Sequence, residues 1–368
     1  MIEQYLTSPD LQLRYLQEIR NKKRGVIGYF SSYVPEEIIL ATGFHPYQFF
    51  SSTGIIGPSL SSIIGPCCSF AKKIAKTTLH KSGLVDGMVF ASFCDSMKNL
   101  NKFLSKDLES KFMKTIFIPA VISGDSINYF KESLQEFMSS LSKYFEIRLD
   151  EEMIRQSVFA TERNRELLRK LSESRMTADP KISGSEIVKM CVLNKLLDKE
   201  LVYEYICQIL HEGKTYTSNI AQQRRIMVVG PTIDTFQFLE EIEKLDVFIA
   251  CEEFMNETGY INIRINQNSD DIMFDISKAY LEGIVNLVVY PYYSRAEWIT
   301  SKIEKYNIGG VLFITMTSCE PYGFSYVTLK KILSKKGIPC MFLELESTRP
   351  PYQREILRMR WFLDTLSN

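Results

Sequence analysis

The 368-residue sequence lacks the features that would point to a nucleic acid, a membrane or an export pathway. Lysine plus arginine and aspartate plus glutamate both number 44, so the formal charge is zero, unlike that of a general nucleic-acid or anionic-membrane binder. Apolar runs such as 226–229 and 285–290 are far shorter than the roughly 18 residues that span a bilayer. The first six residues have no basic segment followed by an apolar stretch, as a secretory signal would. We therefore expect a cytoplasmic protein with no nucleic-acid or membrane partner.

Histidine and short cysteine motifs are also scarce. The histidines at 45, 80 and 211 do not have the i, i+4 spacing of a helical zinc site, so histidine-based metal or triad chemistry is not expected. His45 is interpreted as a surface or hydrogen-bonded residue in a turn. The eight cysteines form no C-x-x-C pair, which excludes zinc ribbons, thioredoxin-type sites and ferredoxin-type cluster motifs. Any metal site must therefore be assembled from distant segments.

Nucleotide-binding and esterase motifs are missing as well. The sequence contains neither G-x-G-x-x-G nor G-x-S-x-G. Residues 213–215 (Gly-Lys-Thr) resemble the end of a phosphate-binding loop, but Gln208 stands where its first glycine belongs and the preceding segment has a helical pattern. A nucleotide site is not expected there.

Apolar runs of strand length alternate with helical patterns over most of the chain. The first part predicts a helix over 10–22, strands over 25–30, 87–91 and 115–118, and helices from Pro35, from Ser96 and over 126–144. Residues 150–212 show almost no strand signal. The last part predicts strands over 225–230, 247–250, 285–290, 310–314 and 340–344 and a helix over 353–366.

Strands that alternate with helices indicate parallel sheets. We predict an α/β protein with two Rossmann-like (flavodoxin-like) parallel-sheet domains. The first covers 1–150 and begins with helices, the second covers 220–368, and a helical connection spans 151–219.

Four of the eight cysteines lie in three loops, and the others are interpreted mainly as core residues. Cys191 and Cys207 are expected in amphipathic helices and Cys340 at the start of a strand, whereas Cys251 is ambiguous. The loop cysteines are Cys67, Cys68, Cys94 and Cys319. Cys94 and Cys319 occur in weakly repeated segments, in which an apolar strand ends in a loop carrying a cysteine and then an acid. Open α/β sheets bind ligands at that end of their strands, but spacing alone leaves a shared metal site and purely structural cysteines both open.

The loop segments at 65–72, 92–98 and 317–324, together with 29–38, resemble the 2-hydroxyacyl-CoA dehydratase family. This family also includes benzoyl-CoA reductase subunits and double-cubane cluster proteins. The resemblance covers nearly the whole chain, and further segments that carry it are 41–44, 129–132, 162–168, 293–298 and 358–364.

The resemblance implies an iron-sulfur cluster held by Cys68, Cys94 and Cys319. Cys68 is preferred to Cys67 because Cys-Ser-Phe-Ala-Lys is the string typical of the family. The implied cofactor is a [4Fe-4S] cluster, or a double-cubane [8Fe-9S] cluster at a homodimer interface. Three thiolates leave one iron of a cubane without a protein ligand, so that this oxygen-sensitive site can bind a substrate oxygen.

The resemblance also implies a reaction and partners. An ATP-dependent iron-sulfur activator protein supplies one electron, a ketyl radical forms on an acyl-CoA substrate, and the neighbouring hydroxyl leaves as water. The partner is a homologous second subunit. The alternatives are a double-cubane or benzoyl-CoA-reductase-like reductase, and a non-catalytic electron-transfer homologue.

The loop 29–37 is where the resemblance implies substrate contact. Ser31 and Ser32 are candidates to hydrogen-bond a substrate oxygen, and Glu37, or Glu36, to handle a proton if burial raises its pKa. Capping of a helix start is the alternative role of both glutamates. Family members often have cysteine near position 31, so the sequence leaves open whether this chain is the active or the electron-relay subunit.

Overall fold

The chain folds into an α/β structure with two parallel sheets, as the sequence predicts, and in the described residues each sheet has four strands. The structure is a computed structural model that describes residues 2–50, 66–108, 111–177, 180–212, 223–232, 236–284, 290, 292–345 and 352–366. The segment 213–215 and all but the last residue of the strand predicted over 285–290 lie outside these residues. Within the described part, no helix is long and apolar enough to cross a membrane.

The first sheet has the order β2-β1-β3-β4. Its strands are β1 (Val26–Tyr29), β2 (His45–Gln48), β3 (Gly87–Ala91) and β4 (Phe112–Ile116). The helices in this part of the chain are α1 (Gln4–Thr7), α2 (Pro9–Asn21), α3 (Glu36–Ala41), α4 (Ser69–Lys81), α5 (Asp95–Asp107) and α6 (Gly124–Phe145).

Strand β2 was not predicted from the sequence. His45 is hydrogen-bonded, which is one of the two roles expected for it, but it lies in this strand and not in a turn. His45 begins this edge strand, is buried, and its Nε2 lies 2.9 Å from the carbonyl oxygen of Leu196. Pro46 follows it, and a proline argues against a strand except at a sheet edge, which is where β2 lies.

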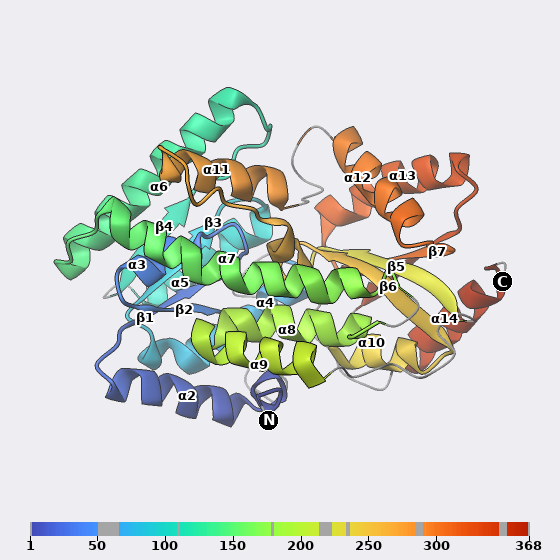
Figure 1. Cartoon of the computed structure of the whole chain (residues 1–368), viewed down its shortest axis with the longest axis horizontal. Coiled ribbons are helices and arrows are strands. Elements are labelled where there is room, and N and C mark those ends of the chain that lie inside the picture. Colours follow the sequence, from blue (N-terminus) through green and yellow to red (C-terminus); the bar gives the residue numbers. More distant parts are fainter. Residues whose placement is uncertain are drawn as a thin grey trace.

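The second sheet has the order β6-β5-β7-β8. Its strands are β5 (Arg224–Gly230), β6 (Val247–Phe254), β7 (Gly310–Met316) and β8 (Cys340–Leu345), and its helices are α10 (Phe236–Glu243), α12 (Tyr292–Lys305), α13 (Glu320–Lys335) and α14 (Gln353–Asp364). Helix α11 (Ile272–Gly283) instead lies beside α6 of the first part (Figure 1). Tyr290 forms an isolated bridge with Val121, which follows β4. Tyr290 therefore lies next to the segment that follows the last strand of the first sheet.

Three helices lie between the two sheets in sequence and run side by side across the molecule in Figure 1. They are α7 (Glu151–Ser174), α8 (Gly184–Leu196) and α9 (Lys199–Glu212). Cys191 is a buried core residue within a helix, as predicted. The prediction that this helix is amphipathic is wrong, because nearly every residue of α8 is buried. A helix that is covered on all sides keeps no polar face.

Candidate cofactor site at three helix N-termini

Cys68, Cys94 and Cys319 occupy equivalent local positions, each directly before the first residue of a helix. Cys68 precedes α4, Cys94 precedes α5 at the end of the loop after β3, and Cys319 precedes α13 just beyond β7. The backbone of Cys68 and Cys94 is extended, as is usual for a residue that caps a helix. The positive ends of three helix dipoles therefore lie at the three cysteines.

The three cysteines line one cavity of about 610 Å³. Direct contacts join its walls: the amide of Ser69 donates to the carbonyl oxygen of Thr317 at 3.0 Å, and the amide of Cys68 donates to Ser96 Oγ at 3.0 Å. The cavity is also lined by Cys67, Phe93, Pro231, Lys72, Lys98 and Lys102. Segments from both sheets thus form a single site.

The thiols in this cavity influence one another. Burial raises the pKa of Cys94 to about 12; the backbone amides of Met97 and Ser96 oppose the shift, while Cys68 and Cys319 add to it. Burial also raises the pKa of Cys319 to about 12, with Cys68 adding to the shift. These thiols are protonated near neutral pH until a cation or a metal cofactor binds them.

Cysteine thiols, the ligands that most iron-sulfur clusters use, are the donor set of this cavity. Within the described part of the chain, no group of three or more His, Cys, Asp or Glu side chains is arranged to hold one metal ion. A cubane places each thiolate on a different iron, so its ligands lie further apart than those of one ion. Three thiols, three helix N-termini and nearby lysines suit a group that carries negative charge. Both Cys67 and Cys68 line the cavity, so the preference for Cys68 stays a prediction.

Ser31 lies in the loop between β1 and α3. Its hydroxyl is buried and accepts a hydrogen bond from the amide of Tyr33 at 3.2 Å. The ring of Tyr33 lies 6.1 Å from the ring of Phe93, the cavity residue that precedes Cys94. One residue of the predicted substrate loop thus packs against the cavity wall, whereas the described residues that line the cavity include none from 29–37. The substrate contact of this loop and the catalytic role of Ser31 stay predictions.

Glu37 is buried in a network of charged and hydroxyl groups behind this loop. Its Oε1 lies 2.6 Å from Arg165 Nη2 and accepts from Thr161 Oγ1 at 2.8 Å. Its Oε2 accepts from the hydroxyl of Tyr280 at 2.7 Å. Both oxygens of Glu37 therefore have partners, and its predicted role in proton handling stays a prediction.

Glu36 is buried beside it and forms an ion pair with Lys199 at 2.7 Å. Burial favours a higher pKa for Glu36, but Lys199 and Arg165 outweigh burial and hold that pKa below its usual range. The raised pKa that proton transfer by Glu36 requires is not found.

Lys195 was missed by the sequence reasoning. Its Nζ is buried, donates to Ser32 Oγ at 2.8 Å and also donates to the carbonyl oxygen of Asn256. Burial lowers the pKa of Lys195 to about 8. It joins the predicted substrate loop to the turn after β6. A lysine that follows Asn194 between the apolar runs 190–193 and 196–197 was the available signal.

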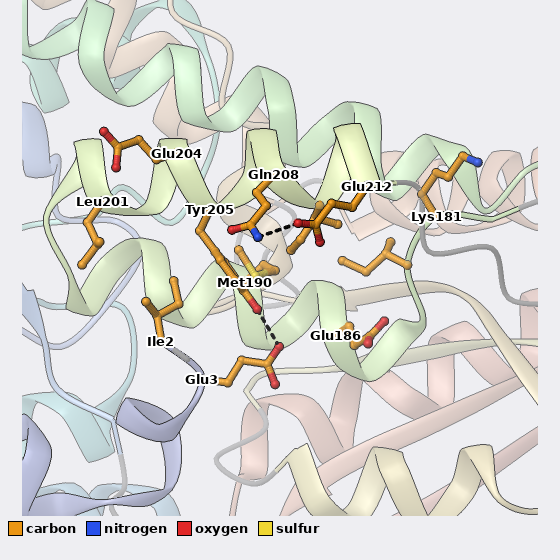
Figure 2. A pocket seen from close by; sticks show the side chains of 12 residues that line it. Ile2, Glu3, Lys181, Glu186, Met190, Leu201, Glu204, Tyr205, Gln208 and Glu212 are labelled. Atoms are coloured by element: carbon orange, nitrogen blue, oxygen red, sulfur yellow. Dashed lines mark hydrogen bonds between the residues drawn. The ribbon is translucent and has the colours of Figure 1, made fainter.

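A second cavity, of about 440 Å³, lies between α8 and α9 and contains no predicted site residue (Figure 2). Tyr205 donates to Glu3 at 3.2 Å, and Gln208 donates to Glu212 at 2.6 Å. The remaining cysteines, at 191, 207, 251 and 340, line neither cavity.

Comparison with known proteins shows the family of the chain. Residues 31–365 match the family model described as 2-hydroxyglutaryl-CoA dehydratase, D-component. The chain is 19% identical over 349 residues to the beta subunit of (R)-phenyllactyl-CoA dehydratase from Clostridium sporogenes, covering 92% of this chain and 91% of that one. It is 22% identical over 329 residues to a benzoyl-CoA reductase subunit of Thauera aromatica, and the match covers 86% of this chain and 84% of that one. It is 16% identical over 356 residues to the beta subunit of lactoyl-CoA dehydratase from Anaerotignum propionicum, and the match covers 93% of this chain and 92% of that one. The chain therefore belongs to the 2-hydroxyglutaryl-CoA dehydratase D-component family.

Proposed function

We propose that this chain is a subunit of a 2-hydroxyacyl-CoA dehydratase and holds a [4Fe-4S] cluster through Cys68, Cys94 and Cys319. The observation that carries the proposal is that these three cysteines, from segments far apart in the sequence, line one cavity. The reaction would eliminate water from an (R)-2-hydroxyacyl-CoA in the cytoplasm. Dehydratase beta subunits among the relatives support this assignment.

The protein's own residues would bind and orient the reactants. The three thiols would hold the cluster, and the amides at the starts of α4, α5 and α13 would stabilise its negative charge. When bound, the cluster would supply a low-potential electron and an iron that is open to a substrate oxygen. The Ser31 hydroxyl oxygen accepts from the amide of Tyr33, and a hydroxyl that accepts one bond can still donate its proton to a substrate oxygen.

The proposed assembly contains a homologous second subunit and an ATP-dependent iron-sulfur activator protein. The relatives are themselves named as subunits, which supports a partner chain. The second candidate function is a benzoyl-CoA-reductase-like or double-cubane reductase, and the match to the benzoyl-CoA reductase of Thauera aromatica favours it. A double cubane requires a homodimer with joined clusters. A homologue that only transfers electrons would turn over no acyl-CoA.

The deciding assay follows formation of the enoyl-CoA from (R)-2-hydroxyacyl-CoA thioesters without oxygen. The chain is co-expressed with candidate partner and activator proteins encoded by its source organism. Elimination that needs ATP, and that stops in Cys94→Ala but continues in Cys340→Ala, supports the dehydratase. Reduction of an acyl-CoA without loss of water supports the reductase, and a loaded cluster with no acyl-CoA turnover contradicts both.

A further inference from the structure

Near the end of an otherwise apolar strand, Thr315 carries a buried hydroxyl that lacks a hydrogen-bond partner among the described residues. It follows Val311–Ile314 in β7 and is 2% exposed. Within the described part of the chain, its Oγ1 has no hydrogen-bond partner of acceptable geometry. Because a buried hydroxyl without a partner destabilises the folded protein, its presence calls for an explanation.

Strand geometry places this hydroxyl toward the start of α13. Side chains alternate along a strand, so Thr315 shares a face with Phe313. That face packs against α12 and α13, and the ring of Phe313 lies 6.1 Å from the ring of Tyr322 in the first turn of α13. Thr315 therefore points toward the helix end where Cys319 stands.

The turn after β7 brings Cys319 back over the strand end. The amide of Cys319 donates to the carbonyl oxygen of Met316 at 2.9 Å, and Ser318 has φ 65°. This left-handed conformation is uncommon in serine and marks a constrained turn. Cys319 packs against the same apolar cluster that contains Phe313 and Tyr322. Thr315, on the face of β7 that bears Phe313, and Cys319 therefore lie on the same side of the strand end.

We propose that the Thr315 hydroxyl donates a hydrogen bond to the Cys319 sulfur when that sulfur is a cluster ligand, and that it thereby raises the cluster's reduction potential. The proposal rests on the cluster assignment made above. A thiolate is a stronger acceptor than a thiol, so binding of the cluster would give this hydroxyl the partner that it lacks. A hydrogen bond to the sulfur withdraws negative charge. It therefore favours the reduced cluster, which carries one more electron.

The test compares Thr315→Val, which removes the hydroxyl at nearly constant shape, with Thr315→Ser, which keeps it. Midpoint potentials are measured on anaerobically loaded protein by redox titration followed by electron paramagnetic resonance. We expect a lower potential in Thr315→Val and a potential close to wild type in Thr315→Ser. Thr300→Val is the control, because Thr300 is a buried threonine whose hydroxyl donates to Glu297 within α12.

A second readout separates tuning of the cluster from a structural role. Without the cluster, Thr315→Val removes an unsatisfied hydroxyl, so it should melt no lower than wild type. A lower melting temperature of this cluster-free variant would mean that the hydroxyl serves the fold and would overturn the proposal. If Thr315→Val does not fold, Thr315→Ala takes its place in both measurements.

The outcomes also separate this inference from the proposed function. If wild type binds no cluster, the proposed function fails, and the inference fails with it. If wild type and all variants bind a cluster with the same potential, the inference is overturned and the cluster assignment stands.

Discussion

Removing either partner of the buried Glu37–Arg165 ion pair should destabilise the protein strongly. Both side chains are fully buried, and their charged atoms are 2.6 Å apart. The pair joins α3 to α7, and Tyr280 of α11 donates to the same carboxylate. Breaking a buried pair takes a charge from its nearest partner, which costs about 3–5 kcal/mol. Without Glu37, Arg165 would keep only the longer ion pair with Glu162, at 3.4 Å. We expect this loss in both Glu37→Met and Arg165→Met.

The double variant makes this prediction specific. When both charges are gone, no unpaired charge remains, so Glu37→Met/Arg165→Met should cost no more than the worse single variant. Lys170→Met on the same helix is the control. Its ion pair with Glu166 has both side chains more than half exposed, so it should change stability by less than about 1 kcal/mol.

The assay is urea unfolding of the cluster-free, reduced protein, followed by circular dichroism. If a single variant folds too poorly to measure, given typical stabilities of about 5–15 kcal/mol, the double variant should be the better folded protein. The reasoning is refuted if each single change costs less than about 1 kcal/mol, or if the cost of the double change equals the sum of the two.

Three further changes test other parts of the fold. Burial lowers the pKa of His45 to about 4, so stability should fall by about 3 kcal/mol as the pH drops from about 6.5 to 4, and His45→Gln should remove this loss in acid unfolding curves. Burial lowers the pKa of Lys81 to about 7, so wild-type stability should rise between about pH 7 and pH 10 as the buried amine is neutral in the folded protein. Lys81→Met should remove this rise in melting temperature, and an unchanged pH profile of the variant would contradict the assignment. In Gly184→Ala the new Cβ would lie 2.5 Å from Ile249 Cβ, so the free energy of unfolding in urea should fall by about 1–3 kcal/mol. Gly323→Ala is the control: its new Cβ has open space around it, so this change should be neutral or stabilising.

Much of the fold followed from local patterns in the sequence. Buried parallel strands read as short apolar runs, and the described strands of the second sheet lie where such runs occur. Strand β2 escaped prediction because Pro46 is tolerated only at an edge, and strand order is not visible in a local pattern. The full burial of α8 follows from the neighbours that cover it, and these come from distant parts of the chain.

The candidate site was predictable in part. The positions of Cys94 and Cys319 beyond strand ends indicated that they face the ligand-binding edge of a sheet. That Cys68 joins them in one cavity depends on how two sheets and three helices pack, which spacing does not encode. Arg165 and Glu37 are 128 residues apart, so their pairing gives no periodic signal.

The most direct test of the central claim is the iron and acid-labile sulfide content of protein purified without oxygen. We predict about four of each per chain, lost in Cys68→Ala, Cys94→Ala and Cys319→Ala but kept in Cys207→Ala and Cys340→Ala. Sulfide in excess of iron would favour the joined double cubane over separate clusters. Wild-type protein without iron, or iron that survives loss of Cys94 or Cys319, would contradict the assignment of these cysteines as cluster ligands.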